Sequence, residues 1–368
     1  MPIYMDRHNI PEEVSAEHVA RMHQEDVKIE HLYGCKGITY WCDEKRNTAF
    51  CLIHAPNKKA LEDMHAHAHG DLPHEIIEVD PAIVESFLGR IEDPKNTKNT
   101  PINIIDESAF RTLMAIKIEK GVSKNTDREE LSKEIKRIYQ SLGDIITKHK
   151  GRPVKQKDDS ILASFDSVTN AIVCTRESQS VLDSGSNAFN LKIKIGLSAG
   201  DPVNTKSSLF EDTVKMSKYL SEISHGHITV TSEVKELFES ENFNTTIDKS
   251  IGVIDPNTEK FLKALMDYFE KEWNNPELNV EKLSAGLGLS KSQTNRKLRS
   301  LTDKSPNQFI QEVRLQNSLA SIKSNTKTVS EIAYESGFAS PTYFSRAFKK
   351  RFGISPKKFA IDYTEVFR

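Results

Sequence analysis

The C-terminal third of the chain carries the same helix-turn-helix pattern twice, and this repeat limits the possible folds more than any other feature. In Val280–Leu301, apolar residues recur at helical spacing until Gly288 and Leu289 interrupt the helix. Ser290 can then cap a second helix, because its hydroxyl accepts a hydrogen bond from a free backbone N–H. The second helix of such a unit can lie in the major groove of DNA.

The second unit, Val329–Phe352, has the same organisation. A short apolar helix is followed by a turn at Gly337-Phe338, and Pro341 stands at the start of the next helix, where proline is well tolerated. A helix expected over Pro306–Ile322 joins the two units. The sequence therefore predicts an all-α domain with a double helix-turn-helix over residues 258–366.

The charges of the chain are unevenly distributed. Residues 259–368 contain 19 Lys and Arg against 12 Asp and Glu, a net charge of +7, whereas the rest of the chain has 32 basic and 41 acidic residues. A basic region joined to an acidic one indicates that one end meets nucleic acid. The plainer alternative is a helical bundle with a solvated basic face.

The run VSEIAYESGFASPTYFSRAFKKRFGISPKKF resembles the C-terminal signature of AraC/XylS-type transcription regulators, and the resemblance covers Phe261–Tyr363. It implies that both recognition helices enter successive major grooves of duplex DNA. By motif position, the base-reading residues are Ser292, Asn295 and Arg296 in the first helix and Thr342, Ser345 and Arg346 in the second. Asn suits adenine and Arg suits guanine.

Further residues of the same helices belong to the expected DNA-binding face. They are Arg299, and the phosphate-contacting candidates Lys349, Lys350 and Arg351. The sequence departs from the family where Ser284 and Thr294 replace apolar residues, which predicts looser packing of the first unit.

The middle of the chain alternates strands and helices, which predicts an α/β domain over residues 108–240. The expected strands are Arg111–Ile118, Ile161–Phe165, Leu191–Leu197 and His227–Thr231, and the expected helices are Arg128–His149, Ser167–Leu182 and Asp212–Ile223. Two polar stretches, Glu92–Thr100 and Glu239–Asp255, are expected to be linkers on either side.

Three runs in this block, 159–165, 191–200 and 209–214, resemble class III nucleotide cyclase domains, over Phe110–Phe238. Such enzymes hold Mg²⁺ with two carboxylates and use an Asn and an Arg on one helix to orient the substrate and stabilise charge. By motif position, these four places are occupied by Lys117, Asp159, Lys215 and Tyr219. Only Asp159 fits, and Lys117 would repel a metal ion. The resemblance therefore implies a degenerate sensor or dimerisation domain, with an active cyclase that uses other residues as the alternative.

The N-terminal block is expected to be an α+β ferredoxin-like domain over residues 1–90. Its expected elements, in β-α-β-β-α-β order, are Pro2–Met5, Ser15–Ile29, Ile38–Trp41, Thr48–His54, Lys58–Ala68 and Glu75–Val79. Ser15 is a suitable N-cap. His18 stands where a capping box would have Glu or Gln, so the reciprocal hydrogen bond is not expected.

Histidine is concentrated in this block, where nine of the 12 His residues lie at or before His74. His65 and His69 are four residues apart on one expected helix and face the same side, while His67 points away. Two imidazoles at that spacing are half of a typical site for Zn²⁺, Ni²⁺, Cu²⁺ or Co²⁺. The further candidate ligands are His8 and His23, with Cys51 and His74 also possible.

Two alternatives to a metal site are open. The His residues near the helix end could be solvated there, next to the negative end of the helix dipole. Trp41, Phe50 and Phe87 could instead line an apolar pocket for a small organic ligand or haem. Cys42 and Cys51 fit small buried strand residues better than ligands.

The stretch Met1–Arg90, with PIYMDRH, FCLIHAPN and HGDLPHEIIEV, resembles a family of small ferredoxin-like proteins, some of which are nickel-binding or nickel-responsive. The resemblance implies a fold that dimerises through its sheets and favours nickel, and with the His spacing the expected cofactor is a transition metal ion, Ni or Zn. It does not carry over a definite ligand set.

Together these features predict a sequence-specific DNA-binding transcription regulator, not an enzyme, whose N-terminal domain senses a metal ion or small ligand. The expected partners are double-stranded DNA and a second copy of the chain. A cytoplasmic location is expected, because four Cys do not make a disulfide framework and no run is long and apolar enough for a signal or membrane helix. The alternatives are a metal-buffering protein, which leaves the basic C-terminal block without a role, and an active cyclase fused to a DNA-binding domain.

Overall fold

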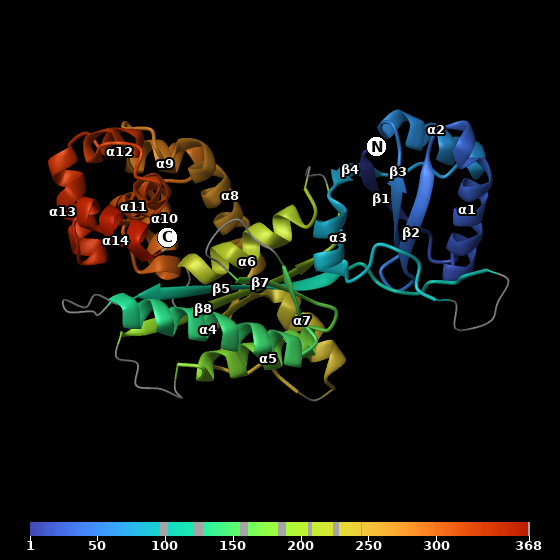
Figure 1. Cartoon of the computed structure of the whole chain (residues 1–368), viewed down its shortest axis with the longest axis horizontal. Coiled ribbons are helices and arrows are strands. Elements are labelled where there is room, and N and C mark those ends of the chain that lie inside the picture. The colour runs from blue at the N-terminus through green and yellow to red at the C-terminus, as the bar shows by residue number, and fades with distance from the viewer. Residues whose placement is uncertain are drawn as a thin grey trace.

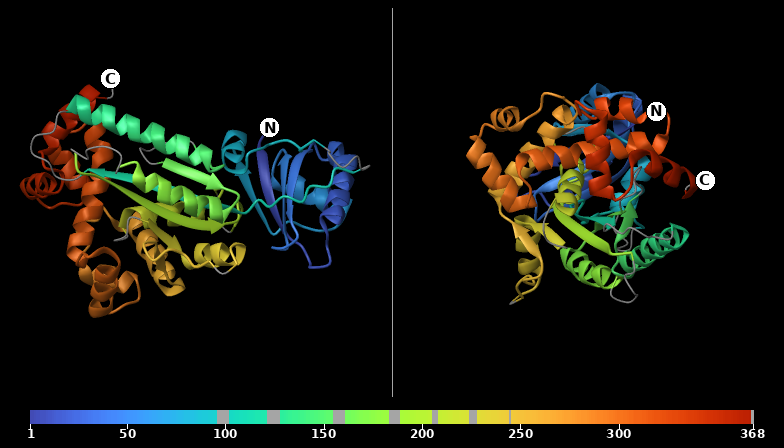
Figure 2. Two further views of the ribbon diagram at one scale, coloured as in Figure 1. Left: turned by 90° about the horizontal axis from the view of Figure 1, so that it is seen from below. Right: turned by 90° about the vertical axis from the view of Figure 1, so that its left-hand side faces the viewer.

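The chain forms three regions in a row in the computed structural model, with the middle region between the other two (Figures 1 and 2). The structure describes residues 1–95, 102–120, 128–154, 161–182, 189–204, 208–223, 228–243 and 245–366. We call the described parts of 1–95, 102–254 and 255–366 the N-terminal, middle and C-terminal regions. The first two contain a sheet each, and the third is helical.

The N-terminal region has the expected β-α-β-β-α-β order. Its elements are β1 (Ile3–Asn9), α1 (Ala16–Ile29), the 3₁₀ turn η1 (Glu30–Leu32), β2 (Lys36–Asp43), β3 (Thr48–His54), α2 (Lys58–Ala68), β4 (Glu75–Val79) and α3 (Pro81–Leu88). The strands lie in the order β2-β3-β1-β4, and all neighbours are antiparallel. Helix α3 was not expected from the sequence, although Asp80 caps it through its carboxylate and Pro81 begins it.

The start of α1 corrects one expectation. The Nδ1 atom of His18 accepts a hydrogen bond from the backbone N–H of Ser15 at 3.2 Å. An imidazole nitrogen therefore takes the place of the Glu or Gln oxygen in the reciprocal half of a capping box, because it too offers a lone pair at the required reach.

Both faces of the N-terminal sheet are covered. On one face, Tyr40 and Ile53 pack under α1 and α2 with Leu61 and Met64. On the other face, side chains of the sheet share a continuous core with the middle region; its members include Met5, Trp41, Phe50, Leu52, Phe87, Leu113, Leu162 and Phe210.

This second core corrects two expectations. Trp41, Phe50 and Phe87 are buried in it and line no apolar pocket among the described residues, since neighbouring side chains fill the space between them. The resemblance implies dimerisation through the sheets, but the face of this sheet opposite α1 and α2 is occupied by the middle region of the same chain. A second copy therefore cannot pair through this face.

The middle region is built on a second sheet. Its strands are β5 (Arg111–Lys120), β6 (Arg152–Val154), β7 (Ile161–Phe165), β8 (Leu191–Gly200), β9 (Ile228–Thr231) and β10 (Gly252–Ile254), in the order β10-β9-β8-β5-β7-β6. The pairs β8–β9 and β9–β10 are parallel, and the others are antiparallel. Its helices are α4 (Arg128–Lys148), α5 (Val168–Ser180), α6 (Glu211–Ile223) and α7 (Ser232–Glu241).

The expected strands and helices of this region are present in the described residues, with His227 outside them. Helices α4, α5 and α7 cover one face of the sheet, where Ile138, Ile172 and Val234 pack on Met114 and Ile193. Helix α6 lies on the opposite face. Its backbone comes so close to β8 that a side chain at Gly196 would collide with the carbonyl of Ser217.

Several short elements were missed. β6, β10 and α7 were not expected, and the segment Glu239–Asp255 is no simple linker, because β10 extends the sheet beside β9 within it. Of the other expected linker, Glu92–Thr100, residues 96–100 lie outside the described residues.

The C-terminal region contains only helices among its described residues. They are α8 (Pro256–Glu272), α9 (Val280–Gly286), α10 (Lys291–Thr302), α11 (Pro306–Ser324), α12 (Val329–Glu335), α13 (Pro341–Phe352) and α14 (Pro356–Val366). Both turns use a glycine with positive φ, 63° at Gly288 and 76° at Gly337, a conformation that other residues rarely adopt. The double helix-turn-helix predicted from the sequence is confirmed.

Helices α6 and α8 connect the middle and C-terminal regions. Tyr219 and Leu220 of α6 share an apolar core with Leu262, Leu265 and Phe269 of α8. Lys263 of α8 also forms an ion pair with Asp212 at 3.0 Å. The first helix-turn-helix unit is thereby fixed to the middle region. Within the described ranges, no helix combines the length and the apolar character that crossing a bilayer requires.

Candidate functional site

The first expected recognition helix, α10, presents its polar face outward. Thr294 and Leu298 are buried, whereas Ser292, Arg296 and Arg299 are exposed. Asn295 is half-buried, and its Oδ1 accepts a hydrogen bond from Nε of Arg299 at 3.2 Å. This bond holds the Asn295 amide beside Arg299 and leaves its Nδ2 donor and one lone pair of Oδ1 for a base edge.

The second expected recognition helix, α13, is arranged in the same way. Phe344, Ala347 and Phe348 face the core. The outward residues are Thr342, Arg346, Lys349 and Lys350, with Ser345 half-buried. Arg351 differs from these lysines, because its Nε donates to both carboxylate oxygens of Glu312, at 2.7 and 2.9 Å. This ion pair leaves Arg351 less available to a phosphate than Lys349 or Lys350.

The two departures from the family pattern lie inside the first unit. Ser284 and Thr294 are both buried. Thr294 donates its hydroxyl hydrogen bond to the carbonyl of Ser290 at 3.0 Å, but the hydroxyl of Ser284 has no hydrogen-bond partner among the described residues. Ser284 therefore carries a desolvation cost that Thr294 avoids.

A second cluster of polar residues lies inside the N-terminal region, between β1 and the helices above it. Because side chains alternate along a strand, Asp6 and His8 of β1 face α1 and α2, while Met5 and Arg7 face the middle region. α1 contributes Asp26, and α2 contributes the two histidines that were expected to share one face.

Three donor atoms of this cluster converge. Nδ1 of His65 lies 3.0 Å from Oδ1 of Asp26 and 3.2 Å from Nε2 of His69, and the last two atoms are 3.3 Å apart. An ion held ~2.1 Å from each ligand would separate them by about 3.0 Å in octahedral or about 3.4 Å in tetrahedral geometry. The donor set therefore fits a transition metal ion without rearrangement of the backbone.

A second group of possible ligands adjoins the first. Asp6, His8 and Cys51 also bring ligand atoms within 4.8 Å of one another. Nε2 of His8 is buried without a hydrogen-bond partner in the described structure and lies 3.6 Å from Oδ1 of Asp6, while Nδ1 contacts Asp71 at 2.9 Å. A buried nitrogen without a partner is what an incomplete ligand set would leave.

The charges of the two groups depend on one another. Burial lowers the pKa of His65, but hydrogen bonds to Asp26 and Asp6 outweigh it and raise the pKa to about 10. For His8, burial is likewise outweighed by Asp6, and the pKa rises to about 9. Imidazolium cations therefore balance the buried carboxylates at neutral pH. Any metal ion must replace protons here.

Burial raises the pKa of the Cys51 thiol well above its ordinary value, and the carboxylates of Asp6 and Asp26 raise it further. Cys51 is therefore a thiol, and it is less ready to ligate than the histidines. Cys42 and Cys51 are both buried, as expected for strand residues.

The structure brings together three of the four histidines proposed as ligands, His65, His69 and His8. His23 belongs to neither group, since its ring packs on Tyr40 with ring centres 5.0 Å apart. The prediction that the helix-end histidines are solvated is wrong for His65, which is 1% exposed. His67 does point away, toward the hydroxyl of Tyr33.

The carboxylates of the cluster, Asp6 and Asp26, were not predicted as ligands from the sequence. Asp6 and His8 are two residues apart on one strand, and that spacing was a usable signal. Asp26 gave no such signal, because only the packing of α1 on α2 brings it to His65.

The positions matched to cyclase catalysis have structural partners. Nζ of Lys117 lies 3.3 Å from Oε1 of Glu222. Lys215 and Tyr219 both contact Glu270 of α8, with distances of 3.1 and 2.7 Å. Asp159 lies outside the described residues. Lys215 and Tyr219 thus connect the middle region to the C-terminal region.

Two family descriptions match parts of the chain. Residues 283–360 match "Helix-turn-helix domain", and residues 4–79 match "Nickel responsive protein SCO4226-like". The chain thus has an AraC-type helix-turn-helix domain at its C-terminal end and an SCO4226-like domain at its N-terminal end.

Several characterised proteins are similar over part of their length. Histidine kinase P4 of Formosa agariphila is 33% identical over 134 residues, which are 36% of this chain and 10% of the kinase. The HTH-type transcriptional regulator MtrA of Neisseria gonorrhoeae is 32% identical over 98 residues, which are 27% of this chain and 31% of that regulator. The chain therefore spans less than a third of the length of either relative.

Two solved structures cover the two ends. The DNA-binding domain of AdpA in complex with a target DNA is 25% identical, with a TM-score of 0.26, and the match covers 27% of this chain and 90% of that one. SCO4226 from Streptomyces coelicolor is 27% identical, with a TM-score of 0.20, and the match covers 21% of this chain and 94% of that one.

Proposed function

We propose that this chain is a sequence-specific DNA-binding transcription regulator whose N-terminal region binds a transition metal ion. One observation carries the metal-binding half: Oδ1 of Asp26, Nδ1 of His65 and Nε2 of His69 lie within 3.3 Å of one another at a buried site. Imidazole nitrogen with carboxylate oxygen suits borderline ions such as Ni²⁺ and Zn²⁺.

The DNA-binding half rests on the two recognition helices. Arg296 and Arg346 are exposed at equivalent places in the two units, and we propose that each reads a base edge. Lys349, Lys350 and Arg299 would contact the phosphates of the DNA backbone. The regulator MtrA has a similar helix-turn-helix segment, which supports the same role here.

His65, His69 and Asp26 would hold the ion, and His8 with Asp6 would complete or adjoin the ligand set. A bound ion would supply positive charge that replaces the imidazolium protons. The residues of the chain exclude water and orient one another around the ion. They also transmit the effect of metal binding to the middle region.

Strand β1 offers a direct route for that change. Asp6 faces the cluster, and the next residue, Arg7, faces the middle region, where it contacts Asp201 at 3.3 Å and the carbonyl of Val203 at 3.2 Å. Val203 precedes α6 in the chain, and α6 contacts α8 through an ion pair and hydrogen bonds. A metal ion alters DNA affinity only if it binds two conformations of the chain with unequal affinity.

For the middle region we propose a cyclase-like fold without catalysis, since Lys117, Lys215 and Tyr219 occupy three of the four positions that the reaction needs. We also propose the domain limits 1–90, 108–240 and 258–366. A homodimer remains part of the proposal, through a surface other than the buried sheet face of the N-terminal region.

The decisive experiment measures metal and DNA binding together. Protein without a His-tag is titrated with Ni²⁺, Zn²⁺, Co²⁺ and Cu²⁺, and its affinity for a selected operator is measured with and without each ion. The His65→Ala/His69→Ala variant should lose the metal and its effect on DNA. The matched control is His67→Ala, on the same helix but pointing away.

Wild-type metal affinity in the double variant would remove the metal site from the proposal. Metal binding that leaves DNA affinity unchanged would make the site a store and not a sensor. Failure to enrich any DNA sequence from a random pool would contradict the regulator itself.

A further inference from the structure

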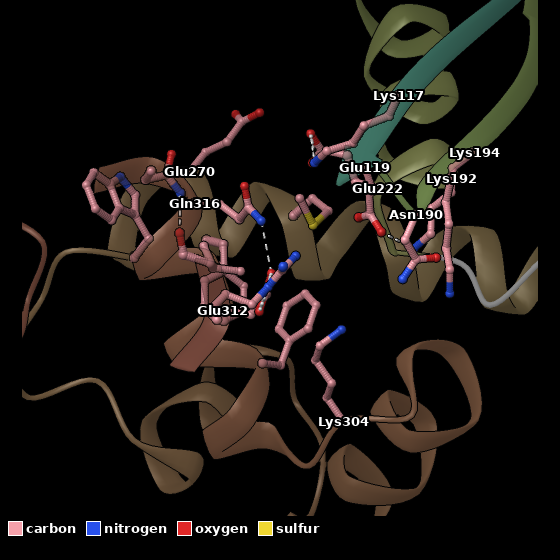
Figure 3. A pocket seen from close by; sticks show the side chains of 17 residues that line it. Lys117, Glu119, Asn190, Lys192, Lys194, Glu222, Glu270, Lys304, Glu312 and Gln316 are labelled. Atoms are coloured by element: carbon pink, nitrogen blue, oxygen red, sulfur yellow. Dashed lines mark hydrogen bonds and ion pairs between the residues drawn. The ribbon is translucent and has the colours of Figure 1, made fainter. Parts of the chain in front are cut away.

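A pocket of about 750 Å³ lies between the middle and C-terminal regions, away from the Asp–His cluster (Figure 3). We propose that this pocket binds a small organic anion, with a carboxylate, sulfonate or phosphate group on an apolar body. The volume is in the range of small-molecule sites, roughly 300–1,000 Å³. The proposal does not depend on the metal site.

The two walls of the pocket have different chemistry. The ends of β5 and β8 provide a polar wall with Lys117, Lys192 and Lys194. The opposite wall comes from α8 and α11 and has a half-buried apolar part at Met266 and Trp273. A ligand that touches both walls must therefore carry a charged end and an apolar end.

The charges of the pocket are not fully matched within the protein. Lys117 pairs with Glu222, and Lys194 pairs with Glu119 at 3.5 Å. Glu312 accepts from Arg351, as described above. In the described structure, neither Lys192 nor Lys304 has a carboxylate within ion-pair distance, and they belong to opposite sides of the pocket. An anionic group that reaches either lysine would gain a charge-assisted hydrogen bond without breaking an ion pair of the protein.

The location of the pocket connects it to both recognition helices. Lys304 follows α10 by two residues, and Arg351 lies in the last turn of α13. Glu270, which holds Lys215 and Tyr219, also lines the pocket. A ligand here would therefore contact the junction that sets the position of the helix-turn-helix units relative to the middle region.

The test uses the full chain and the fluorescent amphipathic anion anilinonaphthalene sulfonate as the probe. Trp273 at the pocket wall is one of two tryptophans, and the other, Trp41, is buried in the N-terminal core. Energy transfer from Trp273 to the probe reports binding at this place. The Trp273→Phe variant should lose the transfer, because the remaining tryptophan lies in the N-terminal core.

We expect one equivalent of probe to bind. The Lys192→Ala/Lys304→Ala variant should bind it about tenfold or more weakly, since the loss of one charged hydrogen bond alone corresponds to about tenfold. Met266→Ser should also weaken it. The matched control, Lys36→Ala/Lys45→Ala, removes two exposed lysines of the N-terminal region and should bind as wild type does.

Three results would overturn the proposal. They are unchanged affinity in the Lys192→Ala/Lys304→Ala variant, equal weakening in the control pair, and displacement of the probe by inorganic phosphate at concentrations as low as those at which the probe itself binds. If phosphate displaces the probe in this way and Met266→Ser binds the probe with wild-type affinity, the apolar wall takes no part in binding. Circular dichroism of each variant checks that it is folded.

Discussion

Nε2 of His65 lies 2.9 Å from Oδ2 of Asp6, and this buried contact joins helix α2 to strand β1. The other ring nitrogen of His65 is bonded to Asp26 of α1. One imidazole thus holds three elements of the N-terminal region together.

Asp6→Ala should destabilise the metal-free N-terminal region by ~3 kcal/mol or more, because it leaves the buried imidazolium of His65 with one carboxylate in place of two. Urea unfolding followed by far-ultraviolet circular dichroism measures the change. Asp63→Ala is the comparison, since Asp63 forms an exposed pair with Lys59 on α2 and should cost at most about 0.5 kcal/mol. Equal losses in the two variants would contradict the role given to Asp6.

Metal affinity should rise with pH beyond the usual imidazole range. His65 has a pKa of about 10 because its bonds to Asp26 and Asp6 outweigh burial, so at neutral pH it must lose a proton before it can ligate. Metal affinity therefore falls as pH falls. If one proton is released on binding, the affinity changes about tenfold per pH unit up to about pH 10. Calorimetry in two buffers of different ionisation enthalpy counts the protons. An affinity that is level above about pH 7 would mean that His65 is not a ligand.

Arg346→Ala should weaken binding to the operator by ~1–3 kcal/mol and reduce discrimination between the operator and scrambled DNA. Lys349→Ala should weaken both DNAs alike and lower the salt dependence by about one ion. Fluorescence anisotropy at several salt concentrations separates the two effects. Undiminished discrimination in Arg346→Ala would exclude base reading by that residue.

The middle region should not make cyclic nucleotides. With Lys117 in place of a metal-binding carboxylate and bonded to Glu222, ATP or GTP with Mg²⁺ or Mn²⁺ should give no product above background. Chromatography of the reaction mixture tests this. Turnover that disappears in Asp159→Ala would reverse the assignment.

Ser284→Ala should stabilise the C-terminal region by about 1 kcal/mol, because it removes a buried hydroxyl without a hydrogen-bond partner. Thr294→Val is the comparison and should not stabilise, since Thr294 uses its hydroxyl to bond the carbonyl of Ser290. Thermal unfolding of both variants measures the difference. A loss of stability in Ser284→Ala would mean that this hydroxyl has a partner in solution.

The elements of the C-terminal region were predictable because their signals are local. Ser290 and Thr328 are the N-caps of two helices. Each forms a capping box with the residue three positions later, Gln293 and Glu331. Gly337 ends the turn with a positive φ. Each of these interactions lies within one turn of a helix, so the sequence alone contains both partners.

The short elements were harder to predict. β6 and β10 have three residues each and exist only because neighbouring strands of the sheet bind them. No periodicity can develop over such a length. The contact of Lys215 and Tyr219 with Glu270 was also invisible, because it joins residues more than fifty positions apart.

By itself, the sequence determined the longer strands and most of the longer helices, the two helix-turn-helix units and the shared face of His65 and His69, since these follow from spacing along one element. Only the tertiary structure decided that Asp26 and Asp6 complete the cluster, that His23 is outside it, and that the second face of the N-terminal sheet is buried against the middle region. The physical reason is that burial and charge pairing depend on which faces pack together. That choice is made by the whole chain and not by any one element.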